Sequence, residues 1–367
     1  MTETVFYSTN YYLKYKDVKV LEFNIGDQRL NVINPRYLPF ILRNMKPTFD
    51  MIRVFCSNRI LMLNRDYCKE ILDACGIDDQ TDISICIMSK ALSFRDNYWI
   101  TPRTSAQTWA DVNLYQNKFS SKISKVALTG DMSDVGIQTV LSDKVFTGEL
   151  TSKGTKAKCY LRCGNELLLL KKEKLQEIQN EILSYYIADL MNLSSSRYIL
   201  RKILGVECSV CRIFTSEVNE LLPCRDIMSA FNEQQVTVDS NTYTYFMNAD
   251  AINFIKMQLF DYITLNTDRN RDNYGLLMHK GKIHSLYPIF DHDSCFKGKG
   301  NNAVYFVTSV TFKETLEYIK TNHSNILNIV RKDIENLKEK LNMKFCLEYI
   351  SYEQYNLMLK QIDRVLS

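Results

Sequence analysis

Apolar residues along the chain follow two spacings, and these predict its helices and strands. Alternating apolar positions in 18–23 and 29–33, on either side of a turn at Gly26, predict a β-hairpin. Apolar positions in 65–75 have the spacing of a short helix, and the following Gly76 is suited to end it because glycine accepts a left-handed backbone. The beginning of the chain is therefore expected to mix helix and strand.

The same reasoning predicts a second hairpin and a longer helix in the middle of the chain. The runs 159–163 and 166–170 are joined by a Gly-Asn pair, a link typical of hairpins. Apolar residues at helical spacing then predict a helix over about 173–193. A further strand is expected within 207–216.

The last part of the chain is expected to be mainly helical. Helices are predicted over about 250–265 and 326–341, whereas 223–244 is expected to be irregular. A capping box of Ser351 and Gln354 predicts the start of the last helix. Together these patterns predict an α+β fold. Its expected regions are an N-terminal α+β region 1–143, a small β-rich region 144–216 and a helical region 217–367.

Composition and charge are those of an ordinary globular protein with room for two or three domains. The chain has 367 residues, of which 46% are hydrophobic and 24% are charged. Its net charge of +4, from 46 basic and 42 acidic residues, is too small to argue for direct nucleic-acid binding. No apolar run approaches the roughly 18 residues that a membrane-spanning helix needs. The first residues also lack a signal-peptide layout. The expectation is a cytoplasmic protein without membrane association.

The cysteines are expected to be reduced thiols. There are 11 of them, an odd number scattered through apolar segments, which does not suit a disulfide framework. Cys208 and Cys211 form the only CxxC pair, and a strand would point their side chains to opposite faces. Buried thiols are therefore expected at this pair instead of a zinc site.

The polar loop 266–275 carries the strongest chemical signal in the sequence. It follows the predicted helix 250–265 and contains Asp268 and Asn273, five residues apart. Transfer of a γ-phosphoryl group needs a carboxylate near the acceptor hydroxyl and oxygen ligands for Mg²⁺. A second carboxylate, Asp291, follows two apolar runs that have the character of strands. This spacing predicts a phosphoryl-transfer site.

Upstream residues fit the same chemistry and also allow a plainer interpretation. The loop 151–158 is small, polar and basic, so its N–H groups and lysines are suited to meet phosphate oxygens. Lys171 and Lys172 end an apolar strand on opposite faces, so only one of them can serve a site, and Glu181 lies at the edge of an apolar helix face. In protein kinases a strand lysine holds ATP phosphates and pairs with a helix glutamate. Solvated strand and helix ends and a solvated turn explain the same residues as well.

Taken together, these motifs resemble those of the HipA-like serine/threonine kinases. The resemblance spans the chain from about Thr147 to the C-terminal helices. The segments that carry it are Ser152–Lys158, Leu170-Lys171, Asn180-Glu181, Asn266–Arg269 with Asn273–Gly275, and Pro288–Asp291. The resemblance implies a two-lobed protein-kinase-like fold, with 144–216 as the small lobe and 217–367 as the helical lobe.

The resemblance also implies roles for individual residues and names the cofactors as ATP and Mg²⁺. Asp268 would be the catalytic base, and Asn273 and Asp291 would be the Mg²⁺ ligands. Lys171 would bind the ATP phosphates, with Glu181 as its ion-pair partner. The residues of the phosphate loop expected at ATP are Ser152, Gly154 and Lys158, and the candidate autophosphorylation sites are Ser152, Thr151 and Thr155.

One position departs from the family pattern. The residue after Asp268 and Arg269 is usually His, and here it is Asn270, which can still hold the loop by hydrogen bonds but cannot titrate near neutral pH. The departure motivates a second hypothesis, a pseudokinase-like module that binds nucleotide, an antitoxin-like partner or DNA without turnover. A third hypothesis is a metal-dependent phosphohydrolase that uses Asp268 and the Asp-His-Asp run at 291–293. It conflicts with the presence of only 4 histidines.

The leading hypothesis is an ATP- and Mg²⁺-dependent kinase that phosphorylates Ser or Thr of a protein substrate. Its expected partners are that substrate and an antitoxin-like protein, without direct binding of nucleic acid. The order of the motifs favours this hypothesis, because phosphate loop, strand lysine, helix glutamate and metal-binding loop follow one another as a two-lobed kinase requires.

Overall fold

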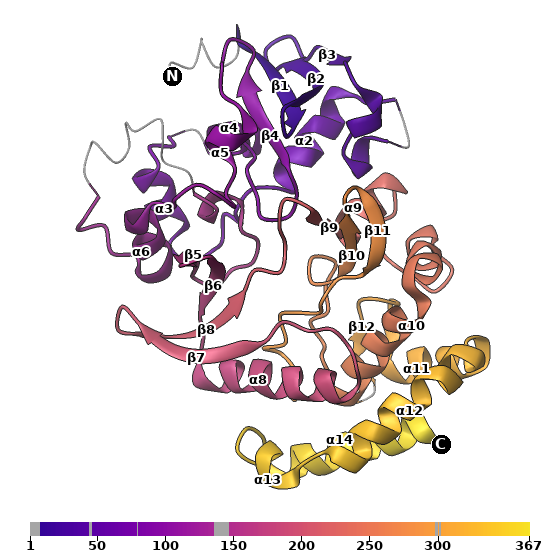
Figure 1. Cartoon of the computed structure of the whole chain (residues 1–367). Coiled ribbons are helices and arrows are strands. Elements are labelled where there is room, and N and C mark those ends of the chain that lie inside the picture. The colour runs from indigo at the N-terminus through magenta and orange to yellow at the C-terminus, as the bar shows by residue number, and fades with distance from the viewer. Residues whose placement is uncertain (1–7, 44–45, 79, 136–146, 298–299, 301) are drawn as a thin grey trace. The chain divides into compact units, whose positions relative to one another are not determined.

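The computed structural model of the protein describes residues 8–367 apart from 44–45, 79, 136–146, 298–299 and 301 (Figure 1). The chain divides into two compact units. The first unit comprises Met1–Lys172, Lys202–Val206 and Thr215–Glu220, and the second comprises Glu173–Arg201, Glu207–Phe214 and Leu221–Ser367. The boundary expected between 143 and 144 lies outside the described residues. The division into three regions stays a prediction.

The first unit mixes short helices with strands, as the sequence predicts. Its elements are β1 (Asn10–Tyr15), β2 (Val18–Asn24), β3 (Leu30–Val32), η1 (Pro35–Tyr37), η2 (Phe40–Leu42), α2 (Phe49–Ser57), α3 (Cys68–Ala74), α4 (Asp82–Met88), β4 (Tyr98–Pro102), α5 (Trp109–Val112), α6 (Ser121–Thr129), η3 (Glu149–Thr151), β5 (Lys158–Cys163) and β6 (Glu166–Lys172).

The N-terminal sheet is antiparallel and has the strand order β3-β2-β1-β4. The predicted hairpin is confirmed as the β2–β3 pair, in which Leu21 lies opposite Val32. Strand β1 was not predicted. It pairs with both β2 and β4, and its residues Tyr11, Tyr12 and Leu13 are all buried, so it lacks the polar alternation that reveals a half-buried strand.

The second predicted hairpin is also confirmed, and it brings two lysines of the proposed site together. Strands β5 and β6 pair from Cys163 opposite Glu166 at the turn to Lys158 opposite Lys171 at the open end. Gly164 in the turn has a φ of 57°, a left-handed backbone that glycine adopts at little cost. The phosphate-loop lysine and the strand lysine of the sequence prediction are therefore cross-strand partners.

The helix predicted over 65–75 begins later than expected. Helix α3 starts at Cys68, and Gly76 follows it with the predicted positive φ of 67°. Residues 65–67 are not helical, and Tyr67 has a left-handed φ of 59°. The reason is long-range, because the side chain of Arg65 and the backbone of Asp66 bond to residues 149–158 instead of to the next turn of a helix.

The second unit is mainly helical, in agreement with the sequence. Its elements are α8 (Leu175–Leu190), β7 (Tyr198–Ile203), β8 (Val206–Arg212), β9 (Asn219–Pro223), α9 (Cys224–Ala230), α10 (Asn241–Thr264), β10 (Gly275–His279), β11 (Lys282–Leu286), β12 (Val304–Tyr305), β13 (Val310–Thr311), α11 (Phe312–Asn322), α12 (Ser324–Lys340), α13 (Met343–Cys346) and α14 (Tyr352–Leu366). The strands β7 and β9 each have two residues that belong to the first unit, and β8 has one.

Helix α10 is the core of the second unit and is longer than the predicted 250–265. It begins at Asn241, where Ser240 accepts a hydrogen bond from the Tyr243 amide, and it is kinked at Asp250. Every residue from Phe254 to Thr264 is buried, so no polar face marks this part of the helix. The expectation of an irregular segment over 223–244 was therefore wrong at both ends, since α9 and the first turn of α10 lie within it.

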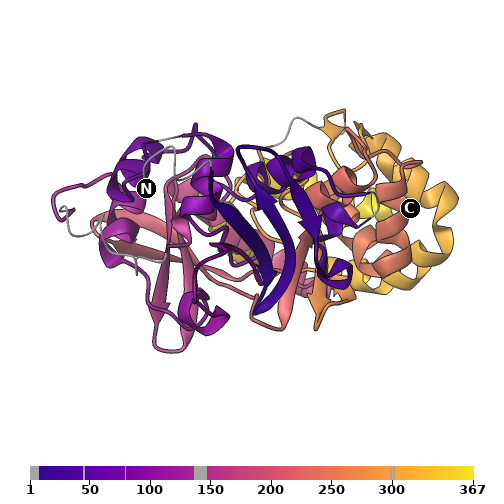
Figure 2. The ribbon, with the colours of Figure 1, turned by 90° about the horizontal axis from the view of Figure 1, so that it is seen from above.

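The C-terminal helices α11, α12 and α14 pack with α10 (Figure 2, where they are gold). Their buried faces follow helical spacing, as in α12, where Leu327, Val330, Ile334 and Leu337 are buried. The predicted capping box at the start of α14 is confirmed, because Ser351 and Gln354 exchange their backbone and side-chain hydrogen bonds. The polar loop that follows α10 is therefore attached to a packed group of helices.

All 11 cysteines are free thiols, as expected. Cys208 and Cys211 are both buried in β8. Among the described residues, no helix combines the length and the apolar character that a membrane crossing requires.

Candidate active site

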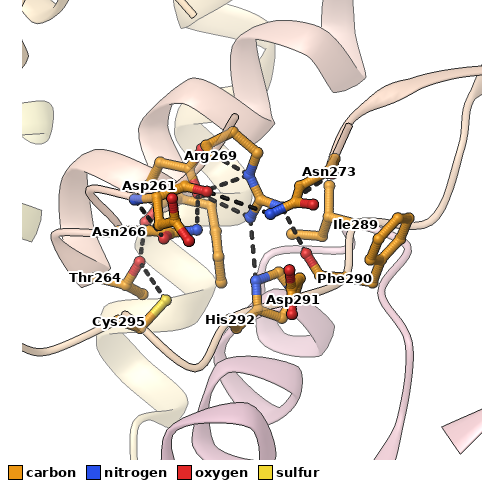
Figure 3. A network of polar contacts seen from close by, with 12 residues as sticks. Asp261, Thr264, Asn266, Arg269, Asn273, Ile289, Phe290, Asp291, His292 and Cys295 are labelled. Carbon is orange, nitrogen blue, oxygen red and sulfur yellow. Dashed lines mark hydrogen bonds and ion pairs between the residues drawn. The ribbon is translucent and has the colours of Figure 1, made fainter. Parts of the chain in front are cut away.

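The loop that follows α10 is organised around one buried ion pair (Figure 3). Arg269 is completely buried, and so is Asp261, which comes from the last turns of α10. Arg269 Nη2 lies 2.9 Å from Asp261 Oδ1, and Nε lies 3.0 Å from Oδ2, a two-pronged contact. Burial alone would lower the pKa of Arg269, but the charge and the hydrogen bonds of Asp261 outweigh it and raise the pKa.

The same guanidinium joins the loop to the segment that carries Asp291. Arg269 Nη1 donates to the carbonyl oxygens of Asn273 at 3.2 Å and Phe290 at 2.8 Å. Arg269 Nη2 also lies 3.1 Å from His292 Nδ1. One side chain therefore fixes the backbone next to two of the predicted site residues, Asn273 and Asp291 (Figure 3).

The loop backbone turns tightly from Asp268 to Asn273. Leu265 ends α10 in a left-handed conformation with φ of 51°. The backbone N–H of Asn270 then donates to the Asp268 carbonyl at 2.8 Å, and the backbone N–H of Asn273 donates to the Asn270 carbonyl at 2.9 Å. The side chain of Asn270 accepts from the Asp272 amide at 2.9 Å. Asn270, the departure from the family pattern, thus supports the turn by hydrogen bonds.

Asp268 and Asn273 face the same part of the loop. Asn273 Nδ2 donates to the Asp268 carbonyl at 3.3 Å, and among the described residues its Oδ1 has no hydrogen-bond donor. Asp268 is exposed, and its backbone N–H donates to Asn266 Oδ1 at 3.3 Å. The amide oxygen of Asn273 and the carboxylate of Asp268 are both available to a ligand.

Carboxylates gather around Asp291, which follows β11 in the chain. Oxygens of Glu173, Asp291 and Asp293 lie within 4.8 Å of one another, a grouping that could hold a metal ion. Burial raises the pKa of Asp268, and the negative charges of Asp291 and Asp293 raise it further. The charges of Asp291 and Asp293 therefore act on Asp268.

Asp291 has an unusual backbone that its neighbours hold in place. Its φ is 63°, and its N–H donates to the Tyr198 hydroxyl at 3.2 Å. An aspartate tolerates the left-handed region better than most residues. Ser195 adds support, because its hydroxyl donates to Ile289 O at 3.1 Å and lies 3.2 Å from His292 Nε2. The backbone at Asp291 is therefore held by contacts from β7 and from the loop before β7.

The predicted helix pair Asn180-Glu181 reaches the same segment. Glu181 is fully buried, and its Oε2 accepts from the His292 N–H at 2.9 Å. Asn180 Nδ2 donates to the Asp293 carbonyl at 2.8 Å. Asn180 and Glu181 therefore hold the backbone at His292 and Asp293, directly after Asp291. The ion pair of Glu181 with Lys171 stays a prediction.

The predicted phosphate loop belongs to the first unit and is closed around one lysine. Lys158 Nζ donates to the Lys153 carbonyl at 2.5 Å. Gly154 has a φ of 96°, and a Cβ atom there would lie 2.5 Å from Lys158 Nζ, so only glycine lets the ammonium group sit against the loop. Of the candidate autophosphorylation sites, Thr151 and Ser152 are buried and Thr155 is exposed.

The two strand lysines have different surroundings. Lys172 donates to the Tyr67 hydroxyl at 2.8 Å, and its Nζ lies 5.3 Å from the centre of that ring. Lys171 is buried at the end of β6 and lies on the other face of the strand. The assignment of Lys171 to the ATP phosphates stays a prediction.

Two contributors to the site were missed in the sequence. Asp261 was overlooked because it lies in an apolar helix, although a lone carboxylate among buried residues is a signal for a buried ion pair. Glu173 was assigned to the start of a helix, whereas it lies just before α8 with its Oε2 accepting from the Ser209 hydroxyl. Tyr305 completes the Asp261 contacts, with its hydroxyl 2.6 Å from Oδ2.

Comparison with known proteins supports the assignment of the fold. The structure is similar to HipA of Shewanella oneidensis MR-1, solved in the toxin–antitoxin complex of HipA, HipB and operator DNA. The TM-score is 0.62 with 10% sequence identity, and the match covers 97% of this chain and 96% of that chain. The Helicobacter pylori proinflammatory kinase CtkA matches with a TM-score of 0.39 and 15% identity over 57% of this chain and 89% of that chain. No protein-family model and no curated protein matches the sequence.

The likeness to HipA extends over nearly the whole of both chains. The protein therefore has the two-lobed, kinase-like α+β fold that the sequence motifs led us to expect. A shared fold does not by itself carry an activity, so the chemistry has to be argued from the residues of the site.

Proposed function

We propose that this protein is an ATP- and Mg²⁺-dependent kinase of HipA-like type that transfers the γ-phosphoryl group to a Ser or Thr hydroxyl of a protein. The observation that carries the proposal is the Arg269 network. One guanidinium group fixes the backbone beside Asn273 and beside Asp291. Asn273 follows Asp268 by five residues in the same loop. Phosphoryl transfer depends mostly on such positioning and on charge stabilisation.

The donor set of the site fits Mg²⁺. This ion prefers a few hard oxygen ligands and keeps water and phosphate oxygens as the others. Asp291 would supply a carboxylate and Asn273 an amide oxygen, while Asp293 and Glu173 place further carboxylate oxygens near Asp291. The role of Asp293 extends the sequence prediction, which named Asn273 and Asp291 alone. These residues would hold Mg²⁺, which would offset the negative charge of the ATP phosphates.

Asp268 is the residue that we assign as catalytic base. Its exposed carboxylate can be approached by a substrate hydroxyl, and its backbone is fixed by Asn266 and Asn270. The raised pKa makes Asp268 a stronger base than an ordinary aspartate. Asp268 would accept the hydroxyl proton while the hydroxyl oxygen attacks the γ-phosphorus and ADP leaves.

The first unit would supply the ATP contacts. The N–H groups of the loop with Ser152, Gly154 and Lys158 are suited to phosphate oxygens, because Lys158 already holds its ammonium group against the loop. Lys171, opposite Lys158 at the open end of the β5–β6 hairpin, would bind the phosphates with Glu181 as its partner. Autophosphorylation in this loop would reach Thr155 first, since Thr151 and Ser152 are buried.

A direct assay tests this proposal. Purified protein is incubated with radiolabelled ATP and Mg²⁺, alone and with a cell lysate, and compared with Asp268→Asn. We expect labelled Ser and Thr with the wild type and a loss of about 100-fold or more with the variant, which removes the base. Asp363→Asn, an exposed change in α14, serves as the matched control and should behave as wild type. Equal labelling by wild type and Asp268→Asn contradicts the proposal.

A pseudokinase-like binding module is the second candidate, motivated by Asn270 in place of His. HipA was solved together with HipB and operator DNA, so a HipB-like partner protein is a reasonable proposal for this chain as well. Calorimetry separates the two candidates. The binding module is favoured if the protein binds ATP tightly without turning it over. It is favoured further if a HipB-like partner protein binds this chain in a fixed ratio.

A further inference from the structure

Three consecutive residues of the N-terminal region, Arg65–Tyr67, hold the phosphate loop at both of its ends. Arg65 is buried, and its Nη1 donates to the Glu149 carbonyl at 3.0 Å and to the Ser152 hydroxyl at the start of the loop. Its Nη2 donates to the Lys158 carbonyl at the end of the loop. One guanidinium group therefore spans the base of the loop.

The two residues after Arg65 hold the middle of the loop and the strand that follows it. The Asp66 N–H donates to the Thr155 carbonyl at 2.7 Å, and Asp66 Oδ2 accepts from the Ala157 N–H at 3.2 Å. The Tyr67 hydroxyl accepts from Lys172 at 2.8 Å. Tyr67 has a left-handed φ of 59°, and helix α3 begins at the next residue.

Neighbouring segments of the N-terminal region add to these contacts. The pairs are Leu61 N with Leu150 O at 2.7 Å, Lys153 Nζ with Ser57 O at 2.7 Å, and Thr151 Oγ1 with Leu92 O at 2.7 Å. The partners of the loop thus lie before α3 and after α4 in the chain. Contacts from outside the β5–β6 hairpin therefore determine the conformation of the loop.

The contacts of Arg65 position the phosphate loop more than they stabilise the core. All of its hydrogen-bond acceptors are neutral oxygens, and its Nε has no partner among the described residues. The nearby Glu149 carboxylate bonds instead to Ser124 Oγ and the Tyr160 N–H, each at 3.0 Å. Among the described residues no acidic side chain bonds to Arg65, although the Glu149 charge acts on it, so burying this guanidinium group is costly.

We infer that Arg65–Tyr67 is a clamp that holds the phosphate loop in the conformation that binds ATP, with Arg65 as its main positioning residue. The inference rests on the proposed function. With the clamp in place, the N–H groups and Lys158 are fixed before ATP arrives, so that little order has to be gained on binding. Loss of the clamp should therefore weaken ATP binding more than it slows the transfer step.

Arg65→Met tests the clamp, because methionine keeps an apolar stem and removes all the donors. We expect the amides of 153–157 to exchange hydrogen at least about tenfold faster than in wild type, as when a local opening becomes easier. We expect the KM for ATP and the Kd of ATP from calorimetry to rise about tenfold, with kcat changed less than about threefold. Arg53→Met, the same change at an exposed arginine of α2, is the matched control and should alter none of these.

The outcomes separate the clamp from the proposed function. Wild type that binds no ATP contradicts the proposed function and the clamp's role in it together. Wild type that binds ATP, with Arg65→Met binding it equally well or exchanging its loop amides at the wild-type rate, contradicts the clamp alone. If circular dichroism shows Arg65→Met to be unfolded, Asp66→Ala takes its place with the same expected changes, since the exposed Asp66 side chain contributes little to the core. Arg65→Lys should recover part of the ATP affinity by restoring one donor group.

Discussion

Arg269 decides the geometry of the candidate active site at the scale of single residues. It has five N–H donors in a rigid plane, and its partners come from α10, from the loop and from the residues on either side of Asp291. Lysine cannot reproduce this set, because its single ammonium group lacks the planar fork. The residue is thus specific in shape as well as in charge.

Arg269→Lys should therefore unfold more easily and lose the site geometry. Lysine keeps the charge but leaves buried acceptors without donors. The loss of a hydrogen bond to a charged group typically costs about 1.5–3 kcal/mol, and we expect a loss of at least this order in the free energy of unfolding measured with urea. Arg103→Lys is the control, since Arg103 pairs with Glu22 at an exposed position and should change stability by no more than about 0.5 kcal/mol. Equal stability of the two variants would contradict the account of the Arg269 network.

Asp268 makes a prediction about pH. Although Asp268 is exposed, partial desolvation of its carboxyl group and the charges of Asp291 and Asp293 raise its pKa in the folded protein, so ionised Asp268 is less favourable in the folded than in the unfolded chain. The penalty is absent below the ordinary pKa of aspartate, grows as pH rises through the folded pKa and is complete above it. Asp268→Asn should therefore be more stable than wild type at neutral pH, and this gain should disappear at low pH. Thermal unfolding as a function of pH measures it, and a gain that grows toward low pH would contradict the assignment.

At the scale of elements, the site depends on how closely β10 and β9 approach each other. A Cβ atom on Gly275 would lie 2.4 Å from the Leu222 carbonyl oxygen and 2.8 Å from Pro223 Cα. Both are backbone atoms at the end of β9, which cannot move aside as a flexible side chain can. The Asn273-to-Gly275 motif thus needs glycine for packing, beside any chemical role of Asn273.

Gly275→Ala should destabilise the second unit by about 1–3 kcal/mol, the usual cost of overpacking. Denaturant unfolding measures the change. The control is Gly281→Asn in the β10–β11 turn, where nothing lies within 4 Å of the new Cβ and where the φ of 77° suits asparagine. If Gly275→Ala is as stable as the control variant, the close approach of the strands is not a constraint.

Local chemistry explains which elements could be predicted from the sequence. The Gly164 turn, the Gly76 helix end and the Ser351–Gln354 capping box depend on neighbouring residues alone, and all three are found. The Arg65–Tyr67 segment could not be predicted, because its non-helical backbone is determined by partners more than 80 residues away. Pattern analysis is limited to local preference in such cases.

The site shows the same limit. Asp268, Asn273 and Asp291 were proposed as site residues from their spacing, since phosphoryl transfer requires fixed offsets along the chain. Asp261 and Glu173 were not, because their roles depend on contacts with residues that are distant in sequence. Their acidic character inside apolar or strand-end segments was the only available signal.

At the scale of the whole molecule, ligand binding should appear as a change in stability. A ligand that binds the folded state at 100 times its Kd stabilises that state by about 2.7 kcal/mol. We therefore expect ATP with Mg²⁺ to raise the Tm of the wild type, and EDTA to remove most of the increase. Asp291→Ala should show little increase and Asp363→Ala the full increase, measured by scanning calorimetry at matched concentrations. An increase that survives in Asp291→Ala would contradict the role of this carboxylate.

The most direct test of the central claim, that this chain phosphorylates Ser or Thr of proteins, is phosphoproteomics of cells that express the wild type or Asp291→Ala at equal levels. The account predicts Ser and Thr phosphosites, in other proteins or in the 151–155 segment of the chain itself, that appear with the wild type and are absent with Asp291→Ala. Identical sets of phosphosites from the two, with both proteins folded, would contradict it.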